Sequence, residues 1–245
     1  MKKKHLDNIL FLDIETVSQN RVYDDLDEQG KSLWNKKHNN LIGRMAGSED
    51  LTPTDTYIQK AGIFAEFGKI ICISVGFLIN EKDPVFRIKS FAGHDEKQIL
   101  SDFSNLLEKH FDNPKKDYLC GHNIKEFDIP YLCRRMLIQG LEFPKLLDIS
   151  GKKPWDLEYL LDTMQMWKFG DYKNYTSLNL LTYLHDIPSP KDDIDGSQVG
   201  KVYYEEDGLE RIRTYCEKDV LAVAKLFMKW QGFSIVDWDV QKVNS

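Results

Sequence analysis

The first clear feature in the pattern of apolar and polar residues is a strand at residues 9–16. Four apolar residues are followed there by Asp13-Ile14-Glu15, which predicts a buried strand that ends in carboxylates. Because strand side chains alternate between two faces, we expect Asp13 and Glu15 on one face and Ile14 on the other. Two carboxylates one pleat apart suit a divalent cation, although a solvated strand end has the same pattern.

Farther along the chain, strand and helix patterns alternate. Apolar runs predict four more strands, at 69–78, 85–91, 118–121 and 157–162, and turn-like residues at 80–84 join the first two. Helical spacing of apolar residues predicts helices at 95–111, from Asp128 to Gly140, at 178–184 and at 209–230, with a loop at 188–200. This order predicts an α/β fold on a mixed sheet that begins as an antiparallel meander.

A long polar connection, residues 17–66, separates the first two strands. It contains a predicted helix at 23–39, weakened by Gly30, and a second helix that opens at Thr52-Pro53, where proline fits the first turn. Connections of this length carry function or elements of their own. Two interpretations stay open, namely an insertion packed on the surface and a lid or clamp beside the carboxylates.

The composition limits the class of protein. The chain has 245 residues, 42% of them hydrophobic, which allows one large or two small globular domains. A net charge of −6 argues against non-specific coating of nucleic acid, but not against a nuclease with an acidic, metal-charged centre. The four cysteines lie in apolar segments without zinc-site spacing and are predicted to be reduced. Without a signal peptide or an apolar run of roughly 20 residues, we expect a cytoplasmic protein with no membrane contact.

Two further segments carry acids next to predicted helices. Tyr215 and Asp219 are four residues apart in the last helix, so they share one face beside its apolar stripe. Asp128 stands at the start of the helix that follows the 118–121 strand. Each acid has a plainer explanation, since Asp219 can pair with a lysine or arginine and Asp128 can cap its helix.

Taken in order, these segments resemble the motifs of a known family. They are Asp13-Ile14-Glu15-Thr16, Asn123-x-x-x-Phe127-Asp128 and Tyr215-x-x-x-Asp219, which match the three motifs of the DEDDy 3′–5′ exonucleases. The chain most resembles the exonuclease domain of family B DNA polymerases and its stand-alone bacterial relatives, to which residues 67–74 and 195–199 are also similar. Thr214 stands where the sister subgroup has a histidine.

The resemblance implies an RNase H-like fold, with a mixed five-stranded sheet flanked by helices. It covers nearly the whole chain outside residues 17–57. We therefore expect residues 1–245 to form a single exonuclease domain with a family-specific insertion at about 17–66.

The resemblance also implies a two-metal mechanism with Mg²⁺ or Mn²⁺. Asp13, bridging, would hold one cation with Glu15 and Asp219, and Asp128 would help to hold the second through water. Without metal, these four acids should repel one another and raise their own pKa values. Tyr215, with an ordinary pKa of about 10, is too weak an acid to serve as a base at neutral pH, and the family assigns it to orienting the attacking water.

Four residues are predicted to contact the substrate. Ile14 and Phe127 would pack on the terminal base or sugar, Asn123 would hydrogen-bond the strand, and backbone amides near Thr16 would meet the 3′-hydroxyl. Alternatively, Ile14 and Phe127 belong to the core and Asn123 is a turn residue. His122 is expected to be structural.

The favoured function is a metal-dependent 3′–5′ exodeoxyribonuclease that acts on the 3′ end of single-stranded DNA and releases nucleoside 5′-monophosphates. A polymerase or repair protein in another chain is the candidate partner, for proofreading or repair. One alternative is a 3′–5′ exoribonuclease, because the same acids and tyrosine serve RNA trimming. Another is a non-catalytic nucleic-acid-binding module of the same fold, against which the retention of all four acids and the tyrosine argues.

Overall fold

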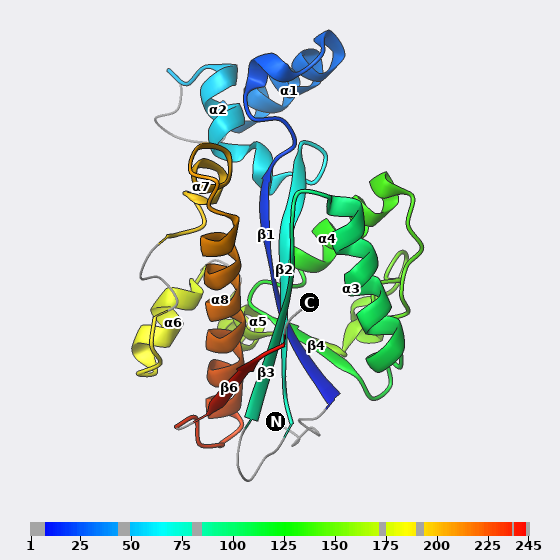
Figure 1. Ribbon diagram of the computed structural model, residues 1–245, viewed down its shortest axis with the longest axis vertical. Coiled ribbons are helices and arrows are strands. Elements are labelled where there is room, and N and C mark those ends of the chain that lie inside the picture. Colours follow the sequence, from blue (N-terminus) through cyan, green and yellow to red (C-terminus); the bar gives the residue numbers. More distant parts are fainter. Residues whose placement is uncertain are drawn as a thin grey trace.

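The structure, a computed structural model, describes residues 8–43, 50–79, 85–171, 175–189, 194–236 and 238–243. The turn predicted at 80–84 lies outside these residues. A mixed sheet with strand order β5-β4-β1-β2-β3-β6 forms the centre of the molecule, and helices flank it on both faces (Figure 1). The predicted α/β class is therefore confirmed.

The central strand of this sheet carries the predicted Asp-x-Glu motif. The strands are β1 (Ile9–Ser18), β2 (Gly68–Leu78), β3 (Val85–Ala92), β4 (Tyr118–Gly121), β5 (Leu160–Asp162) and β6 (Asp239–Lys242). β1, β2 and β3 pair antiparallel, as the predicted meander requires, while β4 and β5 join β1 in parallel on its other side. β1 thus has neighbours on both edges, which suits its continuous apolar sequence.

The prediction of five strands was wrong, because the described residues form a sheet of six. The additional strand β6 lies parallel to β3, and its four residues are exposed. So short and exposed a strand shows no apolar alternation from which it can be predicted. Main-chain pairing holds it at the edge, together with an ion pair of 2.5 Å between Lys242 Nζ and Oε2 of Glu217 on helix α8 (Leu209–Trp230).

The two faces of the sheet pack against different helices. α8 covers one face, and α3 (Glu96–His110) and α4 (Asp128–Gln139) cover the other (Figure 1). Leu10, Leu12 and Ile14 belong to the core cluster that includes α3 and α4, whereas Ile9 and Phe11 pack with α8. The alternation along β1 therefore turns its next odd-numbered residues, the two motif acids, toward the α8 side.

Most of the predicted helices begin and end where their capping residues indicate. Asp95 caps α3 by accepting a hydrogen bond from the Gln98 amide at 3.1 Å, and Ser177 caps α6 (Leu178–Leu184) in the same way. α4 ends at Gly140, whose φ of 64° lies in the left-handed region that glycine adopts without strain. Helix positions predicted from capping and periodicity are thus confirmed.

Two predictions between residues 154 and 205 need correction, and one helix there was not predicted. β5 begins only at Leu160, because residues 154–157 form a 3₁₀ turn. A short helix that was not predicted, α5 (Thr163–Lys168), follows β5 directly. The predicted loop at 188–200 ends earlier, because α7 (Val199–Glu205) starts within it. Elements of six or seven residues hold too few turns to show a helical period.

The connection between β1 and β2 folds around its own small core. It contains a 3₁₀ turn η2 (Tyr23–Asp25), α1 (Glu28–Ile42), α2 (Pro53–Lys60) and a second 3₁₀ turn η3 (Ala61–Ile63). α1 starts later than predicted, so Gly30 lies in its first turn, where its amide donates to the N-cap, Asp27, at 2.6 Å. α2 begins at the predicted Thr52-Pro53 step, where Thr52 and Asp55 cap each other.

The predictions about cysteines and membrane spans can also be compared with the structure. All four cysteines are free thiols, and three of them are buried. Within the described residues, no helix combines the length and apolar character required to cross a bilayer.

Candidate active site

β1 carries the first two acids to a point where its pairing with β2 is irregular. Asp13 pairs with Ser74 and Glu15 with Cys72 on β2, but the register shifts between Glu15 and Thr16. The extra residue at this point is Ile71 of β2, so the irregularity lies opposite the two acids in the neighbouring strand. One ligand atom of Asp13 and one of Glu15 lie within 4.8 Å of each other, as expected for two acids on the same face.

Helix α8 brings a third acid toward this pair. The charge of Asp219 is the strongest electrostatic influence on Asp13, ahead of those of Glu15 and Asp128. Together with loss of hydration on burial, which is the largest cause, these charges hold the pKa of Asp13 well above its usual range. The four acids predicted from the sequence therefore converge on one place.

Asp128 completes the group from the first turn of α4. Its side chain is 4% exposed, and burial, with the charges of Asp162 and Asp219, raises its pKa to about 7 against opposing hydrogen bonds from its own amide and that of Ile14. The interpretation of Asp128 as a helix cap was wrong, because the N-cap residue is Phe127 and makes no side-chain capping bond. Asp128 instead directs its carboxylate at the central strand.

Tyr215 lies beside the acids on the same helix as Asp219. Its side chain is buried and shares a hydrogen bond with Asp219, so the predicted common face of the helix is confirmed. Burial first, and then the charges of Asp219, Glu15 and Asp13, raise the pKa of Tyr215 far above its ordinary value. The phenol therefore keeps its proton at neutral pH and can donate it in a hydrogen bond.

Comparison with known families identifies the chain. Residues 63–236, more than half of it, match the model of a family described as a predicted 3′–5′ exonuclease related to the exonuclease domain of PolB. The chain belongs to this family. The matched segment contains Asn123, Phe127, Asp128, Tyr215 and Asp219 and begins after the Asp-x-Glu motif of β1.

Two DNA polymerases are similar to this PolB-related exonuclease over a part of their length. The DNA polymerase delta catalytic subunit of Drosophila melanogaster is 24% identical over 184 aligned positions, and the match covers 62% of this chain and 16% of the polymerase. A family B DNA polymerase from the hyperthermophilic archaeon Pyrobaculum calidifontis has a TM-score of 0.55 at 14% identity, over 91% of this chain and 24% of the polymerase. This likeness supports the RNase H-like fold, with six strands in place of the predicted five.

The residues predicted to bind substrate in this PolB-related exonuclease lie in two different settings. Ile14, Thr16 and Phe127 line a groove of about 480 Å³ that also reaches Glu15. Asn123 is not among its lining residues, and its φ of 64° agrees with the interpretation as a turn residue. Contact of any of these residues with a substrate stays a prediction.

Ile14 and Phe127 are also partly core residues, as the plainer interpretation holds. Ile14 is 5% exposed and packs within the α3 and α4 cluster. Phe127 is half-buried, with its ring centroid 5.4 Å from that of Tyr131. The two roles are compatible, because each side chain has one edge in the groove.

Sequence reasoning missed Asp162, which supports the loop that carries Asn123 and leads to Asp128. Asp162 is 2% exposed and accepts hydrogen bonds from the amides of Asn123 and Lys125, both at 3.1 Å, and from those of Met164 and Gln165 at the start of α5. The only signal in the sequence was an acid at the end of a predicted strand. His122 lies next to this loop, with its ring nitrogens 3.0 Å from Thr163 Oγ1 and 2.9 Å from the Thr176 carbonyl oxygen, as expected for a structural residue.

Cys216 is a second neighbour of the acids that the sequence did not identify. Its thiol donates to Oδ2 of Asp13 at 3.4 Å, and its sulfur lies within 4.8 Å of ligand atoms of both Asp13 and Glu15. The sequence placed Cys216, like the other cysteines, in an apolar segment but gave no sign of this contact. The thiol belongs to the wall of the acidic cluster.

The chemistry of this cluster fits a hard divalent cation. Acids that raise one another's pKa carry negative charge that the surrounding protein does not neutralise fully. Carboxylate oxygens are the preferred ligands of Mg²⁺ and Mn²⁺. Exonuclease domains of this fold usually use divalent metals, and the residues present match that requirement.

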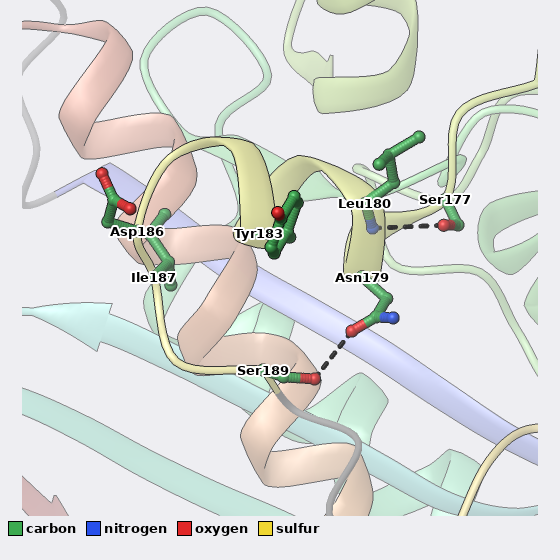
Figure 2. A pocket seen from close by; sticks show the side chains of 7 residues that line it. All are labelled: Ser177, Asn179, Leu180, Tyr183, Asp186, Ile187 and Ser189. Carbon is green, nitrogen blue, oxygen red and sulfur yellow. Dashed lines mark hydrogen bonds between the residues drawn. The ribbon is translucent and has the colours of Figure 1, made fainter.

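A separate hollow of about 450 Å³ lies along α6 (Figure 2). Ser189 Oγ donates to Oδ1 of Asn179 at 2.7 Å across it, and Tyr183 stands at its side with 78% of its surface exposed. None of the predicted site residues lines this hollow. The chemistry of the family is therefore to be sought at the groove beside Glu15.

Proposed function

We propose that the chain is a metal-dependent 3′–5′ exodeoxyribonuclease that shortens single-stranded DNA from its 3′ end and releases nucleoside 5′-monophosphates. The observation that carries this proposal is the convergence of Asp13, Glu15, Asp128 and Asp219 from three distant segments. Four mutually repelling acids are unfavourable in a folded protein unless bound cations offset their charge. Membership in a family of predicted 3′–5′ exonucleases supports a catalytic role for cations bound at these acids.

Each acid has a place in the proposed chemistry. Asp13, Glu15 and Asp219 would hold one divalent cation, Mg²⁺ or Mn²⁺, and Asp128 would help to hold a second, with Asp13 shared. When bound, two such cations stabilise charge on the attacking and leaving oxygens of a phosphodiester.

Tyr215 would orient the attacking water rather than deprotonate it. Its raised pKa keeps the hydroxyl protonated, and its hydrogen bond to Asp219 fixes the ring beside the acids. A protonated phenol can hold a water molecule by a hydrogen bond, whereas a general base would need a pKa near the operating pH.

A strand-shortening assay tests the proposal. Single-stranded DNA, duplex DNA and RNA of matched sequence, each labelled at the 5′ end, are incubated with Mg²⁺, with and without chelator. We expect a ladder of shorter products from single-stranded DNA, none with chelator and none with Asp219→Asn. Equal trimming of RNA would indicate an exoribonuclease, and binding without any shortening would indicate a non-catalytic module.

A further inference from the structure

The described parts of the insertion between β1 and β2, residues 19–43 and 50–67, share a core of their own. Trp34, Tyr57 and Ala61 are fully buried, and the rings of Trp34 and Tyr57 meet edge to face with centroids 5.1 Å apart. Trp34 Nε1 donates to the Pro53 carbonyl at 2.9 Å, which ties α1 to the start of α2. A packed aromatic core of this kind holds its surface residues in defined positions.

The last part of the insertion is attached directly to the central strand. The carbonyl of Gly62, in η3, accepts hydrogen bonds from Thr16 Oγ1 and from the Tyr131 hydroxyl, both at 2.8 Å. A Cβ atom at Gly62 would lie 3.1 Å from the backbone of Val17, so a larger residue there would press against the central strand. η3 therefore forms a wall directly beside the Asp-x-Glu motif.

Helix α7 supplies a second wall. The Tyr204 hydroxyl donates to the Ser18 carbonyl at 2.6 Å, which fixes α7 to the end of β1. α2 and α7 lie next to each other beside the same end of β1 (Figure 1), and residues of both line the groove that reaches Glu15. The groove thus starts at the acids and continues between two anchored walls.

The side chains along this groove suit a flexible polyanion. Arg21 and Lys201 are exposed and line it, and neither forms an ion pair with an acid in the described part of the chain. Ile58 and Ile63 also line it and are 59% and 50% exposed. The acids that line the groove are Glu15, at the end near the cluster, and Glu205 on α7, while Arg21 and Lys201 supply its positive charge.

We infer that Arg21, Ile58, Ile63 and Lys201 bind the nucleotides upstream of the scissile bond and thereby select single-stranded ends. This inference rests on the proposed nuclease function. The two cations would contact phosphates, and the two apolar side chains would support bases. Only a single strand offers both groups together, because a duplex keeps its bases paired and stacked. The insertion and α7 would then together act as a specificity element of the enzyme.

A binding experiment tests the inference without cleavage. A 5′-fluorescein-labelled thymidine hexamer is titrated with the protein in Ca²⁺, and fluorescence anisotropy is followed over a series of KCl concentrations. We expect Lys201→Ala and Arg21→Ala each to weaken binding and to reduce the slope of log K against log salt by about 0.7, the value for one phosphate contact on a single strand. The double variant Ile58→Ala with Ile63→Ala should bind about tenfold more weakly with an unchanged slope.

Matched controls come from exposed cations that do not line the groove. Arg134→Ala on α4 and Lys36→Ala on α1 remove the same charges elsewhere, so their affinities and salt slopes should equal those of the wild type. Circular dichroism establishes that each variant is folded. Groove variants that bind like these controls, or a wild type that binds a duplex as well as the hexamer, would overturn the inference.

The strand-shortening assay separates this inference from the proposed function. If the wild type shortens DNA while the groove variants bind and cleave like the controls, the insertion has no part in selection and the nuclease function stands. If the wild type shortens no strand but the groove variants lose affinity, the nuclease proposal fails and the single-strand site stands.

Discussion

Burial of Asp128 among other acids predicts that the metal-free protein loses stability as the pH rises. The pKa of Asp128 is about 7 in the folded protein, against the ordinary carboxyl value of 3.8 that applies to the unfolded chain. The folded protein therefore holds this proton more tightly than the unfolded chain. Between these two values the folded state binds more protons, and the free energy of unfolding therefore falls with increasing pH. Above about pH 7 the loss is complete.

The size of the effect follows from the two pKa values. Each pH unit between them corresponds to about 1.4 kcal/mol, so full ionisation of Asp128 lowers the free energy of unfolding by about 4 kcal/mol. An asparagine side chain cannot ionise, so Asp128→Asn should stabilise the metal-free protein by about 4 kcal/mol near pH 8. Near pH 5, where the loss has only begun, the gain should be well under that near pH 8.

Urea unfolding followed by tryptophan fluorescence measures this difference in the presence of chelator at both pH values. Asp148→Asn, at an exposed carboxylate, is the matched control and should change stability equally little at either pH. Addition of Mg²⁺ should stabilise the wild type and have a smaller effect on Asp128→Asn. An Asp128→Asn protein that is no more stable than the wild type near pH 8 would refute the reasoning.

Three further predictions concern the support of the site. Tyr215→Phe should lower kcat by about 10²-fold while calorimetry shows nearly unchanged metal binding, and equal loss of both would contradict the water-orienting role. Asp162→Ala leaves four amides without their acceptor, so it should lower the free energy of unfolding by about 3 kcal/mol and reduce activity, whereas a stability like that of wild type would remove Asp162 from the support. Trp34→Ala should lower the local stability of the insertion core by about 3–5 kcal/mol, which faster amide hydrogen exchange in α1 and α2 would detect. Exchange that becomes equally faster in the central sheet would show that the insertion does not unfold as a separate unit.

The sequence predicted the parts of the fold that depend on regular periodicity. β1 was predicted from four consecutive apolar residues followed by two alternating acids, and in the structure it places Leu10 and Leu12 in one core and Phe11 in another. The convergence of Asp128 and Asp219 on that strand was inferred from the resemblance of ordered motifs. The number of residues between the members of one motif can be counted in the sequence. The distance in space between two motifs depends on the fold and cannot.

What the sequence did not predict depends on contacts between remote or exposed residues. β6 consists of four exposed residues and is placed by pairing with β3 and by the Lys242 ion pair, neither of which leaves a pattern in the chain. α7 is short, and its position comes from the Tyr204 contact with Ser18 far earlier in the sequence. Such elements take their conformation from tertiary partners rather than from their own periodicity.

The insertion shows why the groove beside the acids was beyond sequence reasoning. Its helices were predicted, but whether they would pack away from the site or beside it stayed open. Thr16 decides this, because its hydroxyl follows the motif acids directly and bonds to Gly62 at the far end of the insertion. The same stretch of β1 that presents Glu15 therefore also fixes the wall of the groove. A change that loosens η3 should disturb substrate selection and the position of Glu15 together, since both depend on this one short stretch of strand.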